Sequence, residues 1–496
     1  MKVLFVYPEY PDSYWSFRHA LRFISKKAAV PPLGLITVSA MLPEQWEKKL
    51  IDMNVTRLQT SDIVWADYVF ISAMYIQKES VSRVIEACRL HDTKIVAGGP
   101  LFTQEYENYP QIDHFVLNEA EITMPLFLRD LDQGKLPERI YQTGQYADLK
   151  ASVIPDYHLL ERKKYAFMNL QVSRGCPFAC DFCEITALLG RKVRMKSTQQ
   201  IMDELDRLYS LKWRGPVFIV DDNFIGNKKI VKKELLPAMI TWMEKHKYPF
   251  SFNIQSSINL ADDAELMTML NKAGFNSAFI GIETPDEESL RSCNKVQNMN
   301  KNILQSVKEI QKSGIQVSAG FIVGFDNDSP SIFQRQIDFI RQSGIVSAMV
   351  GLLNAPKNTR LYERLKSENR LTIEASGNNT DSSMNFVPKM DYNELIEGYN
   401  GIIQNVYGIE PYYRRIRQFL RKYRKQDHAN QRIDLNRIIA FFKTIVLLGI
   451  IHKGRREYWK FLIWTLIHRP GSFMDAITFA VYGYHYRTVY GLRDKY

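Results

Sequence analysis

Three cysteines fall within eight residues, Cys176, Cys180 and Cys183, in the order C-x3-C-x2-C. Thiolates at this spacing can wrap a loop around a soft metal centre, and three ligands leave one site of a cubane iron–sulfur cluster open to an external ligand. A closed structural zinc site would need a fourth close ligand, whereas Cys88 and Cys293 lie far away in the sequence. We therefore expect an iron–sulfur cluster with an open site, and ordinary buried or surface thiols at the other two cysteines.

The cysteine loop resembles that of the radical SAM superfamily, whose C-x3-C-x-aromatic-C loop lies at the mouth of a partial (β/α)6 barrel. The resemblance implies that Cys176, Cys180 and Cys183 bind three irons of a [4Fe–4S] cluster and that the fourth iron chelates S-adenosylmethionine. It also implies S-adenosylmethionine contacts from Phe182, Asp222, Glu283 and Gly324. Reductive cleavage of this cofactor would produce a radical that takes hydrogen from an unactivated carbon.

Residues 1–135 alternate short apolar runs with helical patterns, as in KVLFVYP, DYVFISAM, KIVAGGP and DHFVLNE. This alternation predicts a doubly wound, Rossmann-like α/β domain with a parallel sheet. Ligands of such sheets bind at the carboxyl ends of the strands. A binding edge is therefore expected at Ser72, Gly98, Gly99 and Glu119. A glycine pair after a strand also serves an ordinary turn, which is the competing interpretation.

The same segment is similar to the cobalamin-binding domain that precedes many radical SAM domains, through PPLG at 31–34, ISAM at 71–74, AGGP at 97–100 and FVLNEAE at 115–121. The resemblance implies that Ser72, Gly98, Gly99 and Glu119 surround a corrinoid. The D-x-H-x-x-G signature, whose histidine ligates cobalt in methionine synthase, is absent, because Asp52-Met53-Asn54 occupies that stretch. The resemblance thus implies either a corrinoid without a lower histidine ligand or a domain with a structural role.

A linker is expected at 136–165, and residues 166–365 then repeat a helical pattern that ends at glycine before an apolar strand. In four such units we expect the glycine to end a helix in the left-handed conformation: Gly215, Gly274, Gly314 and Gly344. Serial βα units predict a full or partial barrel with its chemistry at the carboxyl ends of the strands. The carboxyl ends of these strands are then expected at Asp221, Asp222, Glu283 and Gly324. In the competing, purely structural interpretation, the three carboxylates cap the helices that follow.

The net charge of +11 is concentrated near the C-terminus, since residues 411–496 contain 18 Lys or Arg and 5 Asp or Glu. Apolar and aromatic segments such as IIAFFKTIVLLGII and YWKFLIWTLI accompany these charges. The mixture favours a membrane surface over nucleic acid as a partner. The competing interpretation is a soluble helical appendage whose apolar faces pack on the body. In either case residues 366–496 are expected to form a mainly α, basic, aromatic-rich region without a membrane-spanning helix.

Composition supports a globular, multidomain chain, with 496 residues of which 45% are hydrophobic and 24% are charged. Five cysteines, three of them in one loop, do not resemble a secreted disulfide framework. The segment MKVLFVYPEY predicts a buried strand and not a secretory signal. A cytoplasmic protein is expected, located peripherally at the inner face of the membrane if its basic region binds lipid.

Nearly the whole chain resembles one subfamily of cobalamin-dependent radical SAM proteins. The resembling segments include VDDNFIGNKK and GFIVGFDNDSPSIFQRQIDFI. This subfamily includes hopanoid C-2 methylases and archaeal tetraether lipid ring synthases. The resemblance implies methylation of an unactivated carbon, with a lipid or another small molecule as substrate. It also implies a [4Fe–4S] cluster, S-adenosylmethionine and cobalamin as cofactors, and a reductase, flavodoxin or ferredoxin as electron donor.

Three other functions compete with methylation. One is radical formation of a carbon–carbon bond or ring without methyl transfer. Another is RNA modification, which the basic region would suit, but the extra N-terminal cysteines of methylthiotransferases do not occur before Cys88. A third is a noncatalytic corrinoid sensor, against which the intact three-cysteine loop argues. Nucleic acid is therefore not the expected partner.

Overall fold

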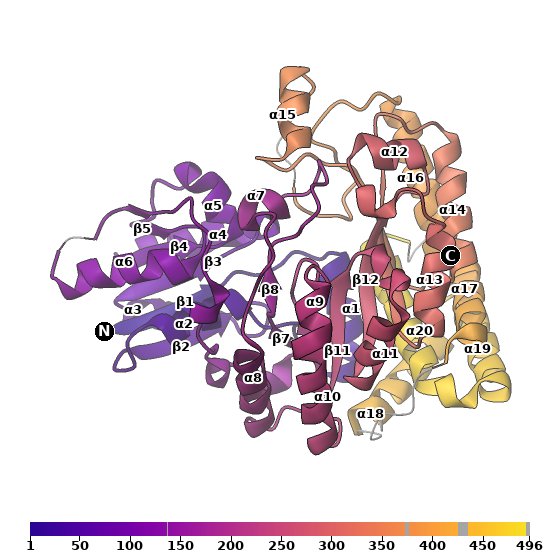
Figure 1. The fold of residues 1–496 in the computed structure, drawn as a ribbon, viewed down its shortest axis with the longest axis horizontal. Helices are drawn as coiled ribbons and strands as arrows, with labels where there is room; N and C mark the ends of the chain where they lie inside the picture. The colour runs from indigo at the N-terminus through magenta and orange to yellow at the C-terminus, as the bar shows by residue number, and fades with distance from the viewer. Residues whose placement is uncertain (136, 373–375, 425–434, 493–496) are drawn as a thin grey trace.

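A computed structural model describes residues 1–135, 137–372, 376–424 and 435–492. Figure 1 shows an N-terminal α/β part at the left, a second α/β part in the middle and C-terminal helices at the right. The three-part α/β architecture expected from the sequence is confirmed. The domain limits given above, 1–135, 136–165, 166–365 and 366–496, stay predictions.

The first sheet contains six parallel strands in the order β2-β1-β3-β4-β5-β6. Its strands are β1 (Lys2–Tyr7), β2 (Glu47–Asp52), β3 (Tyr68–Ser72), β4 (Lys94–Gly98), β5 (His114–Val116) and β6 (Ile140–Tyr141). The last of these lies within the stretch expected to be a linker. The helices of this part include α2 (Leu33–Met41), α3 (Thr60–Trp65), α4 (Lys78–Arg89), α5 (Pro100–Glu105) and α6 (Ala120–Asp132).

Strand β1 shows why this part is doubly wound. Leu4 and Val6 belong to one hydrophobic cluster, whereas Val3 and Phe5 belong to another, and all four side chains are fully buried. Because successive side chains of a strand point to opposite faces, the two clusters lie on opposite faces of the sheet. Burial of each such side chain contributes roughly 2 kcal/mol before the entropy of ordering the chain is counted.

The second sheet contains six parallel strands in the order β14-β13-β12-β11-β10-β7, so β7 and β14 are its two edges. Its strands are β7 (Met168–Leu170), β10 (Gly215–Ile219), β11 (Phe250–Ser256), β12 (Phe275–Glu283), β13 (Gln316–Val323) and β14 (Ala348–Leu352). Helices α8 (Thr198–Ser210), α10 (Leu236–Lys245), α11 (Ala264–Lys272), α13 (Ile303–Lys312) and α14 (Ser331–Ser343) alternate with these strands. This arrangement confirms the partial (β/α)6 barrel.

Two details of the barrel differ from the repeat expected from the sequence. Strand β11 is not among the four expected units, because Tyr248 and Pro249 precede it in place of a glycine. The expectation for Gly215 is wrong, since this residue begins β10 and the left-handed residue after α8 is Lys212, with φ of 61°. Gly344 does end α14 in the left-handed conformation, with φ of 71°.

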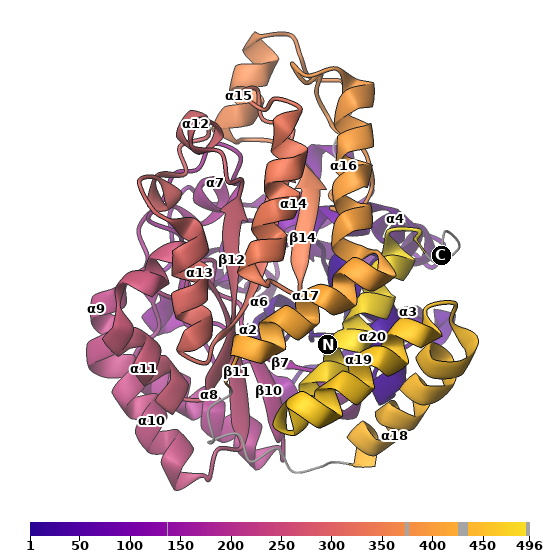
Figure 2. The same cartoon turned by 90° about the vertical axis from the view of Figure 1, so that its right-hand side faces the viewer.

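The C-terminal region is mainly helical, as expected. Its elements are α15 (Arg360–Ser367), α16 (Tyr392–Tyr407), α17 (Ile409–Lys422), α18 (Leu435–Thr444), the π-helical segment η11 (Ile445–Ile451), α19 (Arg455–His468) and α20 (Phe473–Val489). Figure 2 shows α16 and α17 beside β14 and α14. In the described part of the chain, no helix combines the length and apolar character needed to cross a membrane.

Tyrosines attach these helices to the edge strand β14. The Tyr407 hydroxyl donates to Ala348 O at 2.6 Å, and the Tyr486 hydroxyl donates to Ser347 Oγ at 3.1 Å. Tyr14, from the 3₁₀ helix η1 (Tyr14–Ser16), stacks on Tyr486 with ring centroids 4.4 Å apart. The N-terminal part, the barrel and α20 therefore meet at one buried aromatic seam.

Candidate active site

The cysteine loop begins after β8 (Ser173–Arg174), which pairs antiparallel with β9 (Arg194–Met195). Gly175, between β8 and the first cysteine, has φ of 91°, and a Cβ there would lie 2.9 to 3.1 Å from three backbone carbonyl oxygens. Cys176 N donates to the carbonyl of Gly190 at 3.2 Å. Glycine is therefore required where the loop leaves the strand, and the loop is closed by backbone contacts at its base.

The three loop cysteines are free thiols that lie close enough to influence one another. Burial raises the pKa of Cys183 to about 12, with further contributions from Cys180 and Cys176 that raise it and from Lys295 that lower it. Among the described residues, no three His, Cys, Asp or Glu side chains are arranged to hold a single metal ion. A cubane cluster places its thiolates around its corners and not around one point, so three free, neighbouring thiols of this spacing fit such a cluster as a donor set.

A cavity of about 220 Å³ borders the loop and is lined by Cys180, Cys183 and Thr186 on one side and by residues 358–360 on the other. Gln297 Nε2 lies 3.6 Å from the Cys180 sulfur. The neighbouring segment 293–295 holds the loop by two hydrogen bonds. Asp181 N donates to Cys293 O at 3.0 Å, and Asn294 Nδ2 donates to Ala179 O at 3.0 Å. Cys293 therefore contacts the loop through its backbone carbonyl, and its thiol is buried.

Three of the residues expected near S-adenosylmethionine gather beside the loop. The Phe182 and Phe325 rings lie 6.2 Å apart, and Phe325 follows Gly324. Gly324, with φ of 102°, donates its N–H to Asp328 Oδ2 at 2.9 Å. Glu283, at the end of β12 with φ of 66°, pairs with Lys295 at 2.6 Å, and Lys295 Nζ lies 5.9 Å from the Phe182 ring.

The electrostatics of this group depend on Lys295. Burial alone would lower the pKa of Lys295, but Glu283 and Cys180 outweigh that effect and raise it. The ammonium group therefore stays charged next to the cysteine thiols. It is suited to balance negative charge that thiolates would bring to this buried place.

The two neighbouring aspartates after β10 have different positions. Asp221 is fully buried and accepts from Val172 N at 2.7 Å and from Ser173 Oγ at 2.6 Å. Asp222 Oδ2 accepts from Gly175 N at 3.3 Å, and burial raises the pKa of this carboxyl to about 6. Asp221 thus holds the strand that leads into the cysteine loop, whereas Asp222 lies at the loop itself.

The residues expected around a corrinoid divide into two groups. Ser72 and Gly98 are partners across β3 and β4, and a Cβ on Gly98 would lie 2.6 Å from Val116 O. Gly99 has φ of 89°, and a Cβ there would lie 2.5 Å from Ser72 Oγ. These three residues share the carboxyl edge of the first sheet. Glu119, by contrast, is buried and directed at the barrel.

Glu119 belongs to an ionic cluster that we call the Glu119 junction, made of Glu119, Glu121, Arg174 and Arg194. Glu119 accepts from Arg194 at 2.6 Å through each oxygen and from Arg174 at 3.3 Å, while Glu121 pairs with Arg174 at 2.7 Å. Arg174 and Arg194 are the facing residues of β8 and β9, which flank the cysteine loop. The junction therefore joins the first domain to the base of the loop.

Asn54 occupies the place where the cobalt-ligating histidine of the D-x-H signature would stand. Its Oδ1 accepts from Tyr10 N at 2.9 Å, and its Nδ2 donates to Asp52 Oδ1 at 2.8 Å and to Pro8 O at 3.3 Å. Through these bonds, the Asn54 amide joins the loop that follows β1 to the loop that follows β2. Met74, which follows β3, is 46% exposed, and its sulfur accepts a hydrogen bond from the Tyr10 hydroxyl at 3.3 Å.

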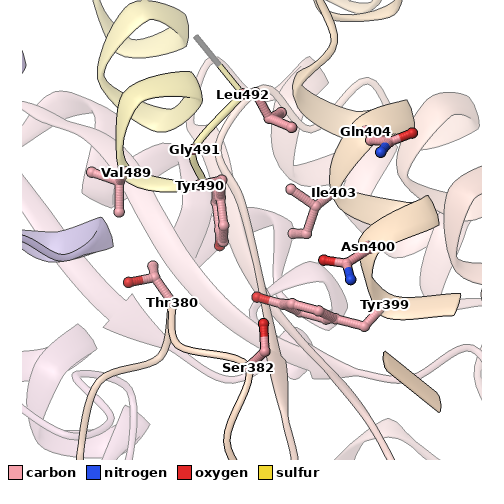
Figure 3. Close-up of a pocket in the computed structure, with 10 residues that line it drawn as sticks. All are labelled: Thr380, Ser382, Tyr399, Asn400, Ile403, Gln404, Val489, Tyr490, Gly491 and Leu492. Atoms are coloured by element: carbon pink, nitrogen blue, oxygen red, sulfur yellow. The ribbon is translucent and has the colours of Figure 1, made fainter. Parts of the chain in front are cut away.

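A second cavity, of about 290 Å³, lies between α16, residues 380–382 and the end of α20. Figure 3 shows the Tyr399 and Tyr490 side chains converging beside β14, and both hydroxyls are directed at Val350 O, at 3.5 and 3.3 Å. Its described lining residues include no cysteine, carboxylate or histidine. We therefore place the site at the cysteine loop and not here.

Four residues at the site were not predicted from the sequence: Arg174, Arg194, Lys295 and Gln297. Arg174 precedes Cys176 by only two positions, so proximity to the motif was the available signal for it. The others are distant in sequence, and no local pattern marks them.

Three sequence families match the chain in succession. They are a B12 binding domain at residues 23–128, the radical SAM superfamily at residues 170–340 and a domain of unknown function (DUF4070) at residues 359–494. Similar proteins include an uncharacterized methyltransferase of Synechocystis sp., 39% identical over 98% of this chain and 91% of the relative. Another is the hopanoid C-2 methylase of Rhodopseudomonas palustris, 30% identical over 98% and 92% of the two chains.

A solved structure with the same fold is the cobalamin-dependent S-adenosylmethionine radical enzyme OxsB with aqua-cobalamin bound. It matches with a TM-score of 0.65 and 15% sequence identity, covering 100% of this chain and 80% of that one. This likeness concerns the arrangement of the parallel-sheet domains, which agrees with the two sheets described above.

Proposed function

The chain belongs to the cobalamin-dependent radical SAM methyltransferases, and from that premise we propose that it methylates an unactivated carbon of a membrane lipid. Its cofactors are those of the family: a [4Fe–4S] cluster, S-adenosylmethionine and cobalamin. The observation that carries the proposal is the Glu119 junction, which holds the first domain against the base of the cysteine loop. The two cofactor-binding parts are thereby organised as one site.

We propose the following roles for the residues of this site. Cys176, Cys180 and Cys183 bind the cluster; Phe182, Asp222, Glu283 and Gly324 contact S-adenosylmethionine; Ser72, Gly98 and Gly99 border the corrinoid. Glu119, which we expected beside the corrinoid, acts through Arg174 and Arg194 and positions the loop. Substrate-contacting residues are not part of this assignment.

The bound cofactors supply radical generation and methyl transfer, which side chains alone cannot perform. The chain's own residues hold and shield those groups. Lys295 keeps a positive charge at the buried thiols, and Glu283 fixes its ammonium at 2.6 Å. Gly175 and the β8–β9 pair set the path of the loop. Reduction requires an external one-electron donor, for which we propose a flavodoxin, a ferredoxin or a reductase.

The lipid part of the proposal has two supports. One is the similarity over nearly the full length to a protein named hopanoid C-2 methylase. The other is the chemistry of the C-terminal region, which combines a strongly basic composition with apolar and aromatic helices. We propose a cytoplasmic enzyme that works peripherally at the inner face of the membrane.

An anaerobic assay tests this function. The protein is reconstituted with iron, sulfide and cobalamin, then supplied with reductant, S-adenosylmethionine and a lipid extract from its host. Mass spectrometry measures S-adenosylhomocysteine, 5′-deoxyadenosine and the mass of the lipid products. We expect both nucleoside products to depend on lipid and a lipid product heavier by one methylene unit.

The controls separate the competing functions. Suppose that 5′-deoxyadenosine forms without S-adenosylhomocysteine and that no lipid gains the mass of a methylene unit. This result would support formation of a ring or a carbon–carbon bond in place of methylation. No stimulation by lipid would overturn the proposed substrate class. Cys176→Ala should abolish both products, whereas Cys88→Ala, which alters a buried thiol of α4, should retain them.

A further inference from the structure

The C-terminal helices carry a concentration of exposed apolar side chains. Among the described residues, 19 large apolar side chains are exposed, and ten of them lie between Ile438 and Ile467. The other nine are scattered over the remaining chain. Single exposed apolar residues are normal on soluble proteins, but a contiguous group marks an interaction surface.

The first half of this surface is the continuous helix formed by α18 and η11. Four of its exposed side chains are Ile438, Phe442, Val446 and Ile450, with exposed fractions of 43%, 61%, 51% and 58%. They follow one another at intervals of four residues, so they form one stripe along the helix. Ile439 and Ile451 of the same helix are also exposed. Thr444 and Leu448, on another side of the same helix, are buried.

The second half is α19, which packs on η11, α17 and α20. Trp459, Ile463, Leu466 and Ile467 are exposed, and Ile467 reaches 70%. Phe461, Leu462 and Thr465 of the same helix are buried. The helix therefore has apolar side chains on both its protein-facing and its outward-facing sides, unlike an ordinary surface helix with a polar outer face.

The charges around this surface are predominantly positive. Lys443, Lys453, Arg455, Arg456, Lys460 and Arg469 lie between residues 442 and 470, and the acidic residue of that stretch, Glu457, pairs with Lys460 at 2.7 Å. Arg455 and Arg456 are exposed at the start of α19, directly after the turn from η11. An apolar stripe bordered by exposed cations complements the interface of a bilayer that contains anionic lipids.

We propose that residues 438–467, which we call the docking hairpin, bind an anionic lipid bilayer with both helices lying in the plane of its surface. In-plane binding agrees with the absence of a helix long and apolar enough to cross a bilayer among the described residues. The inference rests on the proposed function for its purpose, delivery of the enzyme to lipid, but the binding itself needs neither substrate nor cofactor.

The position of the hairpin is compatible with an open cofactor site. Figures 1 and 2 both show α18 and α19 at the lower end of the molecule and α7 (Ile185–Leu189), which follows the cysteine loop, towards the upper end. A membrane bound at α18 and α19 therefore leaves the loop end of the barrel accessible to an electron donor, and a lipid substrate would leave the bilayer to reach the loop.

The test measures binding of the full-length reconstituted protein to vesicles by flotation. One set of vesicles contains phosphatidylcholine alone and the other contains phosphatidylcholine and phosphatidylglycerol in a ratio of about 3 to 1, both without S-adenosylmethionine. We expect about tenfold stronger binding to the anionic vesicles at about 0.1 M salt, and a several-fold loss at about 0.5 M salt.

A pair of matched variants identifies the surface. The triple variant Ile450→Ser, Ile463→Ser, Ile467→Ser should bind anionic vesicles at least about tenfold more weakly, because it removes apolar side chains that would enter the interface. The control triple variant Val64→Ser, Leu90→Ser, Val387→Ser alters side chains that are 63%, 75% and 54% exposed elsewhere. This control should bind like the unmodified protein. Circular dichroism confirms that both variants are folded.

Two outcomes would overturn the proposal. One is equal vesicle binding by the two triple variants. The other is a dimer, detected by light scattering, that the hairpin variant alone disrupts, which would make this surface an interface between copies of the chain. Since the binding assay contains no S-adenosylmethionine and measures no reaction, failure of the methylation assay leaves this result unaffected, and the two proposals fail separately.

Discussion

Glu119 of the first domain receives two hydrogen bonds of 2.6 Å from Arg194 of the barrel, although the two residues are 75 positions apart. The side chain of Glu119 is 4% exposed and that of Arg194 is 11% exposed. A carboxylate and a guanidinium buried in this way depend on each other, because neither can be rehydrated if its partner is lost. The contact is a buried link between the two domains, in addition to the aromatic seam at Tyr14.

Replacing Glu119 should therefore destabilise the protein far more than replacing a surface carboxylate. Glu119→Gln leaves the buried Arg194 without a counter-charge and is expected to lower the free energy of unfolding by about 3 kcal/mol. Glu9→Gln, which breaks a pair with Arg18 whose side chains are both 39% exposed, should cost less than about 1 kcal/mol. Urea unfolding followed by fluorescence measures both. Equal losses would show that the junction does not hold the domains.

Cluster binding should depend on the loop cysteines alone. Cys180→Ala should abolish the iron and sulfide content that remains after gel filtration, because the open-site cluster needs all three thiolates. Cys88→Ala removes a fully buried sulfur of α4 and should keep the cluster while lowering stability by about 1 kcal/mol. Retention of the cluster in the Cys180 variant would refute the assignment.

Adding a methyl group at the carboxyl edge of the first sheet should impair cobalamin binding. In Gly99→Ala the new Cβ would lie 2.5 Å from Ser72 Oγ at a residue whose φ is 89°, so the backbone must move. We expect at least a tenfold weaker cobalamin affinity, measured by absorbance titration. Gly401→Ala, in α16 with nothing within 4 Å of the new Cβ, should bind normally and be slightly more stable. Unchanged affinity in Gly99→Ala would place the corrinoid elsewhere.

The stability of the protein should fall as the pH drops from about 6.5 to 4, partly because of His485. This side chain is fully buried, and burial lowers its pKa to about 4, with its Nε2 3.0 Å from Tyr14 O and His19 and Asp12 nearby. The folded state thus binds fewer protons than the unfolded state across this range, so acid favours unfolding by up to about 3 kcal/mol.

His485→Gln should reduce that pH dependence while keeping a hydrogen-bond donor for the Tyr14 carbonyl. The measurement is the free energy of unfolding at several pH values between 4 and 7. His91→Gln, at an exposed histidine, serves as the control and should leave the slope unchanged. A slope that is the same in the His485 variant and the unmodified protein would refute this cause.

Local patterns in the sequence were sufficient to predict the cysteine loop and most strands of the two parallel sheets. Cys176, Cys180 and Cys183 were predicted as cluster ligands from their short spacing, which a loop preserves wherever it is placed. Strands such as β1 and β12 are recognisable because a strand buried in a parallel sheet needs an apolar run. Strand β11 escaped recognition because Pro249 precedes it, without the glycine that marked the other units.

Only the tertiary structure shows which residue Glu119 pairs with and which apolar side chains of the C-terminal helices are exposed. From sequence, Glu119 ends a strand of a ligand-binding sheet, but its partner Arg194 comes from another domain, and no periodicity encodes such a distant pair. The exposed stripe from Ile438 to Ile467 illustrates the same limit, since apolar residues at helical spacing look alike whether they face a core or the solvent. Sequence by itself determined the chemistry of the cysteine loop and the fold class, because both depend on residues near one another in the chain. Packing determined which charges are buried together and which apolar face is left outside, because both depend on contacts between distant segments.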